Sequence, residues 1–248
     1  GATATWLGTI AFAFQIYADF SAYSDIACGV AGWLGYEFPE NFHQPYLARG
    51  MQDFWRRWHI SLSTWLRDYL YIPLGGSRHG TWITYRNLLL TMVLGGLWHG
   101  AAWTFVAWGA YHGLLLAAER WWLERIAPRL GARVSASSVA AVFQVALTFV
   151  AVCLGWVLFR ARTWVDAITM LANLVGLGEG SGGYPLDTTG TAVLALAVGG
   201  VALAWLREQA RWDWQRPLWA RYAVLTTCLA GIVIWAPRVS APFVYFQF

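Results

Sequence analysis

The feature that most constrains this chain is an apolar stretch over residues 85–118. Between Arg86 and His112, His99 is its single Asp, Glu, Lys, Arg or His. As one helix, the 34 residues of the stretch would measure about 51 Å at ~1.5 Å per residue, whereas a bilayer's hydrocarbon core is about 30 Å thick. We therefore expect the stretch to tilt steeply or to break. Gly95-Gly96 and Gly100 are its weak points, because glycine loses most backbone entropy on ordering.

His99 lies between these glycines, and two interpretations of it remain open. A broken helix is tolerated inside a membrane where it lines a cavity or is buried in protein. An imidazole at such a place is costly, which favours a functional role. Alternatively, Gly96-x-x-x-Gly100 is a helix-packing notch, and His99 only hydrogen-bonds a neighbouring helix.

The composition indicates an integral membrane protein. Of the 248 residues 58% are hydrophobic and 12% charged, against about 25% charged residues in soluble domains. Lysine is absent, which excludes a P-loop or Schiff-base lysine in this chain. The arginines follow apolar runs, which is typical of lipid headgroup contacts rather than of nucleic-acid binding. Cys28, Cys153 and Cys228 are far apart, so we expect no disulfide framework and no CxxC-type metal site. No other metal site and no bound cofactor are expected either.

The apolar runs predict an all-α, polytopic protein with a broken or re-entrant helix near His99. The expected spans are 2–18, 85–118, 138–159, 191–206 and 222–236, with a short amphipathic helix over 164–175 and a glycine-rich loop over 176–190. Loops 119–135 and 207–221 hold four Arg each, which places them in the cytoplasm by the positive-inside rule. The chain begins inside an apolar run without Met. We therefore expect a single domain, 1–248, that lacks its N-terminal helices.

Polar groups near the first span give weaker signals. Asp19 and Asp25 stand in an otherwise apolar region, so we expect them to face the protein interior and to accept hydrogen bonds. Their six-residue spacing does not stack them on one helical face, which disfavours a catalytic pair. A loop is expected over 37–47 because it holds two prolines. His43 in that loop and His79 in a later one are expected to be solvated or locally bonded.

Residues 50–72 are predicted to form one amphipathic helix that lies in an interface or lines a wet cavity. Its aromatic face holds Phe54, Trp58, Leu62, Trp65 and Tyr69, and its polar face holds Asp53, Arg56, Arg57, Ser61, Thr64, Arg67 and Asp68. His59 lies on the border, three residues after Arg56 and four before Ser63. A surface-lying helix with a solvated His59 is the alternative.

His59 and His99 together suggest general-base chemistry on a hydroxyl, because no Ser-, Cys- or Lys-based nucleophile site is evident. A neutral imidazole accepts a proton near neutral pH, and burial favours the neutral form. The second histidine or Arg56 would then orient the base or stabilise the oxyanion of a thioester under attack.

Five motifs resemble the membrane-bound O-acyltransferase family in its bacterial alginate O-acetylation branch. They are YADFSAYSD at 17–25, FWRRWHISLS at 54–63, YIPLGG at 71–76, GLWHGA at 96–101 and YFQF at 245–248. The resemblance implies an enzyme of the bacterial inner membrane whose catalytic histidine matches His99 and whose second signature position matches His59. We assign substrate binding to Arg56, Ser63, Trp98, Asp19 and Asp25.

The resemblance further implies transfer of acetyl from a cytoplasmic donor, expected to be acetyl-CoA, to an exported polysaccharide, with periplasmic partner proteins. Two alternatives are kept. One is transfer of D-alanine from a carrier protein to teichoic acid by the same fold. The other, from a different class, is a proton-coupled transporter that uses His59 and His99 as a relay. Inverted repeats would favour the transporter, and none is visible between the two halves of the sequence.

Overall fold

A computed structural model describes residues 1–129 and 137–178, together with residues 199 and 226. All regular structure in these residues is helical and no strand occurs among them, which confirms the all-α prediction. In chain order the elements are α1 (Ala2–Trp33), η1 (Pro45–Leu47), α2 (Met51–Arg57), α3 (Ile60–Leu66), η2 (Arg67–Tyr71), α4 (Thr81–His99), α5 (Trp103–Arg125), η3 (Ala127–Arg129), α7 (Ser138–Arg160) and α8 (Trp164–Leu174).

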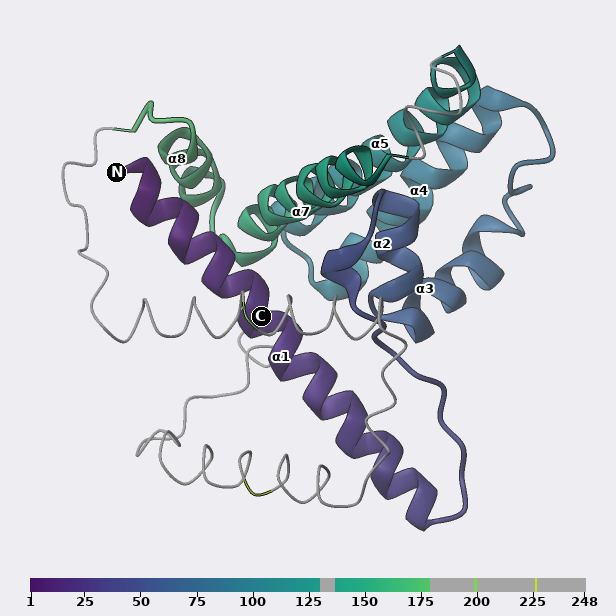
Figure 1. The fold of residues 1–248 in the computed structure, drawn as a ribbon. Coiled ribbons are helices and arrows are strands. Elements are labelled where there is room, and N and C mark those ends of the chain that lie inside the picture. The colour runs from purple at the N-terminus through teal and green to yellow at the C-terminus, as the bar shows by residue number, and fades with distance from the viewer. Residues whose placement is uncertain (130–136, 179–198, 200–225, 227–248) are drawn as a thin grey trace. The chain divides into compact units, whose positions relative to one another are not determined.

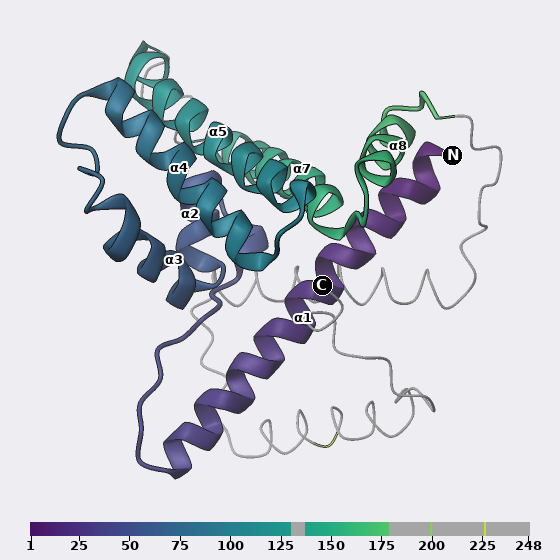
Figure 2. The same cartoon turned by 180° about the vertical axis from the view of Figure 1, so that it is seen from behind.

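The long apolar stretch breaks directly after His99, at Gly100, which was one of the two predicted break positions. Helix α4 ends at His99, and α5 begins three residues beyond Gly100, at Trp103. The two helices lie side by side in both views (Figures 1 and 2). The other expected weak point, Gly95-Gly96, remains inside α4.

Close backbone contact explains why glycine occupies these positions. A Cβ added at Gly96 would lie 2.2 Å from the carbonyl oxygen of Phe105, and one at Gly109 would lie 2.2 Å from that of Met92. Both distances are far below van der Waals contact, so any side chain would push α4 and α5 apart. Gly96 therefore serves as a helix-packing notch, which was the second of the two interpretations given for this segment.

Helix α7 is the one helix in the described parts that is long and apolar enough to cross a membrane. It matches the span expected over 138–159. The spans expected over 2–18 and 85–118 lie in α1, α4 and α5, which are less apolar. Those expected over 191–206 and 222–236 lie outside the described residues, residues 199 and 226 apart.

Two further segments were predicted, one correctly. The short amphipathic helix over 164–175 is α8, and its last residue, Leu174, accepts a hydrogen bond from the indole of Trp6 in α1 at 3.0 Å. The start of the loop predicted over 119–135 is wrong, because helix α5 continues to Arg125. The i, i+4 pair of Arg120 and Glu124, at 2.8 Å, extends the helix into polar sequence.

The prediction of one helix over 50–72 is wrong. The segment forms α2 and α3 with an interruption at Trp58 and His59, followed by the π-helical turn η2. Its aromatic face is divided as well. Phe54 and Trp58 are buried, whereas Trp65 is 49% and Tyr69 66% exposed. Periodicity gave no sign of this break, because His59 leaves the helical conformation in response to contacts from other parts of the chain.

An aromatic core connects these elements. It is made of Phe54 and Trp58 from the α2 segment, Trp108 from α5, and Trp156 and Phe159 from α7, all of which are buried. Trp58 and Trp156 are 4.9 Å apart between ring centroids, and Trp108 and Phe159 are 5.3 Å apart. Burying each large aromatic side chain contributes up to about 3 kcal/mol, so this core fixes where α2 stands against α5 and α7.

Candidate functional site

The break at His59 is built by the loop over residues 39–44. His59 has a left-handed backbone with φ 44°, which is unusual for a residue other than glycine. Asn41 bonds the far side of the break, because its carbonyl oxygen accepts the amide of Ile60 at 2.9 Å. On the near side, the carbonyl of Arg57 accepts the amide of His43 at 2.9 Å. The loop therefore replaces helical hydrogen bonds that the break removes.

The Asn41 side chain also fixes the imidazole of His59. Its Oδ1 lies 3.2 Å from His59 Nδ1, and it accepts hydrogen bonds from the Ser61 amide at 3.1 Å and the Ser61 hydroxyl at 2.9 Å. Its Nδ2 donates to the hydroxyl of buried Ser24 in α1 at 3.1 Å. Because Oδ1 can only accept, the proton of neutral His59 is assigned to Nδ1. Nε2 is then left as the proton acceptor.

His59 is held in its neutral form. It lies between α2 and α3, outside the spanning helices, and is 9% exposed. Burial first, and the neighbouring His99 second, lower the pKa of His59 from the usual 6.5 to about 4. At neutral pH its Nε2 therefore carries a free lone pair.

His99, the last residue of α4, is half-buried against aromatic rings. Its ring centroid lies 5.0 Å from Trp98, 5.2 Å from Trp108 and 5.1 Å from Phe159. Because Gly100 packs against Phe105, where a Cβ would come within 2.7 Å of the ring, the chain turns tightly after His99. The imidazole is thus presented at a helix end among aromatic side chains.

Three of the predicted site residues come together. The Trp98 ring lies 6.4 Å from His59 and 5.0 Å from His99, and His99 influences the pKa of His59. These contacts bring two histidines 40 positions apart in sequence into one neighbourhood. Neither histidine lines either of the two cavities described below, so a cavity shared by both stays a prediction.

Arg56 and Ser63 lie on a different side, in a cavity of about 490 Å³ bounded by α2, α3, η2, α4 and α5. Two of its arginines have carboxylate partners: Arg67 donates to Asp68 at 2.7 Å and Arg120 to Glu124 at 2.8 Å. Arg56 lies close enough to the carboxylate of Glu119 to interact with it electrostatically. The same cavity is walled by Trp55, whose ring is 5.7 Å from Trp108, and Trp108 in turn contacts His99.

The expectation that Asp19 and Asp25 both face the interior is wrong for Asp25. Asp25 is exposed on α1, whereas Asp19 is half-buried, and substrate binding by either carboxylate stays a prediction. The buried polar group of this helix is Ser24, which bonds Asn41. The two loop histidines, His43 and His79, behave as expected. His43 is exposed with Glu40 as its local partner at 3.5 Å, and His79 is exposed.

Sequence reasoning missed two residues. Asn41, the residue that holds His59, had no signal beyond a polar side chain in a proline-bounded loop. His112 had a signal that was passed over, since it is a second histidine in an apolar helix. It is 1% exposed, and neither of its ring nitrogens has a hydrogen-bond partner in the part of the chain that the structure describes. A Cβ at Gly155 would come within 2.6 Å of its Nε2.

The arrangement can perform proton transfer on a bound hydroxyl. It offers an imidazole at a helix end, a second imidazole with a fixed tautomer, and aromatic side chains around both. Within the described residues no three His, Cys, Asp or Glu side chains come together to hold a metal.

Comparison with known proteins gives the chemistry a context. The family model for the membrane-bound O-acyltransferases matches residues 2–160. The chain is 42% identical to "Probable alginate O-acetylase AlgI" of Pseudomonas putida, over 98% of this chain and 53% of that protein. It is 43% identical to the peptidoglycan O-acetyltransferase of Helicobacter pylori, over 69% of this chain and 32% of that protein. It is 32% identical to the teichoic acid D-alanyltransferase of Streptococcus thermophilus, over 46% of this chain and 29% of that protein. The chain thus spans about half the length, or less, of these relatives.

Proposed function

Since the chain belongs to the membrane-bound O-acyltransferase family, we propose that it forms part of an enzyme that acylates hydroxyl groups of a polysaccharide. The acyl group is acetyl, the donor is acetyl-CoA on the cytoplasmic side, and the acceptor is an exported polysaccharide of the alginate type. The enzyme is a multi-pass protein of the bacterial inner membrane and works with periplasmic partner proteins. The observation that carries this proposal is the pairing of His99 with a neutral, anchored His59 through Trp98.

His99 acts as the general base. It takes the proton of an acceptor hydroxyl as the oxygen attacks the thioester carbonyl, which gives a tetrahedral oxyanion. Collapse of that intermediate breaks the C–S bond, and the proton returns to the leaving thiolate. His59 positions this chemistry, since Asn41 fixes its ring and burial keeps it uncharged.

The acyl donor is held in the cavity that contains Arg56 and Ser63. The guanidinium of Arg56 interacts electrostatically with Glu119, and its planar donors also suit a phosphate group of coenzyme A. The rings of Trp55 and Trp108 contact each other, and Trp108 contacts His99, so these two rings connect the wall of this cavity with His99. Supporting this assignment, the cavity combines cationic side chains with an aromatic wall.

The alternatives are less well supported. D-Alanyl transfer to teichoic acid is the activity named for a relative that matches 46% of the chain, whereas an O-acetylase matches 98%. A proton-coupled transporter has less support, because the family model that matches this chain and the relatives named above are all of acyltransferases. Because His99 is central in both alternatives as well, a His99 variant alone does not distinguish them from acetyl transfer. Identifying the transferred group (acetyl, D-alanyl or a proton) does.

The test is acetyl transfer by the full-length enzyme in proteoliposomes, supplied with radiolabelled acetyl-CoA and a uronate oligosaccharide. The His99→Ala variant should lose about 10²–10⁴-fold in rate while its amount in the membrane fraction stays near normal. His43→Ala, a histidine exposed in a loop, is the matched control. Near-normal transfer by a well-inserted His99→Ala variant would remove His99 from catalysis and leave Gly96 and Gly100 with packing roles alone.

A further inference from the structure

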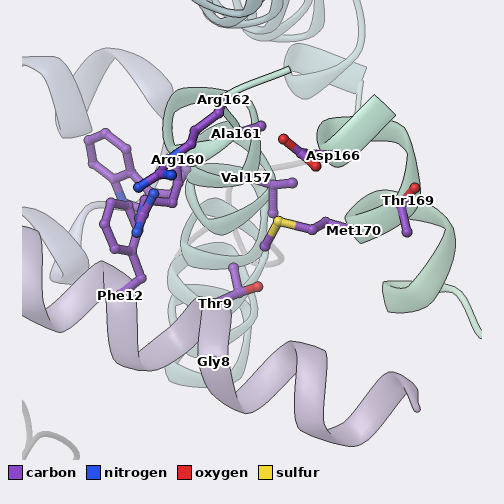
Figure 3. A pocket seen from close by; sticks show the side chains of 11 residues that line it. Gly8, Thr9, Phe12, Val157, Arg160, Ala161, Arg162, Asp166, Thr169 and Met170 are labelled. Carbon is purple, nitrogen blue, oxygen red and sulfur yellow. The ribbon is translucent and has the colours of Figure 1, made fainter. Parts of the chain in front are cut away.

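A second cavity lies away from both histidines, between α1, the end of α7 and α8. Its volume is about 520 Å³. Figure 3 shows Thr9 and Phe12 entering from α1, Arg160 and Arg162 from the end of α7, and Met170 from α8. None of the chemistry proposed above uses this cavity.

The charged groups of the cavity leave a net positive charge. Arg160 is half-buried and stands over the ring of Phe12, with its guanidinium carbon 5.8 Å from the ring centroid. Arg162 is exposed, and neither arginine forms an ion pair among the described residues. The one acidic side chain of the lining, Asp166, is engaged elsewhere, since it accepts the backbone amide of Thr163 at 3.1 Å and caps α8. Two guanidinium groups therefore remain available for an anion.

The remainder of the cavity is mostly apolar. Beyond the arginines it is lined by Phe12, Trp156, Val157 and Met170, and at Gly8 an added Cβ would meet no atom within 4 Å. The hydroxyl of buried Thr9 is satisfied within its own helix, where it donates to the carbonyl of Thr5 at 2.8 Å. The cavity thus combines an apolar space with a cationic rim, which matches an amphiphile.

The position of the cavity agrees with such a ligand. Arg160 is the last residue of α7, the described helix that is apolar enough to cross a membrane. The end of a spanning helix lies at the level of the lipid headgroups. The following helix, α8, exposes Trp164, Val165 and Ile168, as expected of a helix that lies in the interface.

We propose that this cavity binds one anionic phospholipid, with its phosphate on Arg160 and Arg162 and an acyl chain against Phe12, Val157 and Met170. Arginine favours phosphate because its planar guanidinium donates two parallel hydrogen bonds. An acidic polysaccharide fits less well, because the apolar lining offers few groups for sugar hydroxyls. Binding here ties α1, α7 and α8 together, independently of the acyl-transfer chemistry.

The test is native mass spectrometry of the full-length protein in detergent, titrated separately with phosphatidylglycerol, phosphatidylethanolamine, inorganic phosphate and a uronate oligosaccharide. Phosphatidylglycerol should bind at one site in preference to phosphatidylethanolamine. The Arg160→Gln/Arg162→Gln variant should weaken that binding about tenfold or more. The Arg78→Gln/Arg125→Gln variant removes two exposed arginines elsewhere and should leave it unchanged.

Two further variants separate a direct effect from misfolding. Gly8→Leu keeps both charges but fills the apolar space, so it should also weaken binding. Arg160→Lys/Arg162→Lys keeps the charge but loses the paired hydrogen bonds, so its affinity for phosphatidylglycerol should lie between those of the wild type and the double glutamine variant. Unchanged phosphatidylglycerol binding in both the double glutamine and the Gly8→Leu variants would overturn the proposal. So would arginine-dependent binding of inorganic phosphate or the oligosaccharide with affinity equal to that of the lipid.

Discussion

The anchoring of His59 by Asn41 gives a quantitative prediction for the Asn41→Ala variant. The substitution removes the oxygen that faces His59 Nδ1 and that accepts two hydrogen bonds from Ser61. Each such bond contributes about 1 kcal/mol net. The left-handed backbone of His59 costs about 1–3 kcal/mol, and the side chain of Asn41 helps to maintain it. The backbone bond from the Ile60 amide to the Asn41 carbonyl is kept. The substitution also removes the amide that donates to the Ser24 hydroxyl, so the expected loss is about 3–4 kcal/mol, local to the break.

This loss should appear mainly in catalysis. Once His59 is free to rotate, acetyl transfer by the full-length enzyme should fall about ten- to a hundredfold, or roughly 1.4–2.7 kcal/mol of barrier. His59→Ala should have an effect of the same size. Because Asn41 acts through His59, adding Asn41→Ala to His59→Ala should cost no more than about 0.5 kcal/mol further.

The assay is the initial rate of acetyl transfer in proteoliposomes for the two single variants, the double variant and His43→Ala. His43 is the matched control, because it lies in the same loop and contacts one exposed carboxylate, that of Glu40. His43→Ala should retain wild-type activity. Full activity of a folded Asn41→Ala variant would refute the anchoring role. So would additive losses in the double variant, which would mean that Asn41 acts by a route independent of His59.

Three other predictions follow from the packing and the charges. Gly96→Ala places a methyl 2.2 Å from the carbonyl oxygen of Phe105 and should cost about 1–3 kcal/mol, seen as a lower Tm in detergent. Gly8→Ala, whose methyl meets no atom within 4 Å, is the control and should leave Tm unchanged. Equal Tm values for the Gly96→Ala and Gly8→Ala variants would contradict the close contact between α4 and α5. The pKa of His59, about 4 in the folded protein, lies below its usual 6.5, so the unfolded chain takes up the proton first. The free energy of unfolding should therefore be at its full value above pH 6.5 and fall towards pH 4, by at most about 3 kcal/mol. If a His59→Gln variant showed the same pH dependence in denaturant titrations, His59 would not be its source. Arg56→Gln should raise the KM for acetyl-CoA about tenfold with little change in kcat, and an unchanged KM would take Arg56 out of the donor site.

Much of the architecture was determined by the sequence alone. The α7 span, the amphipathic α8 and the helix end at His99 were all predicted, because each depends on local apolar composition or on glycine. The family also followed from local motifs, and the match over residues 2–160 confirms it. A pattern of this kind is encoded within one or two helical turns, so no knowledge of distant contacts is needed.

Tertiary structure decided the details of the site. Periodicity favoured one helix over 50–72, yet the loop around Asn41 bonds both sides of His59 and breaks that helix. Arg56 and Ser63 line a cavity that His59 does not line, although all three residues belong to the same segment. Asp25, expected inside, is exposed, since Ser24 takes the interior position on α1. Each of these outcomes depends on hydrogen bonds and packing between residues far apart in the chain. A local pattern cannot encode such contacts, because their free energy exists only once the partners have been brought together.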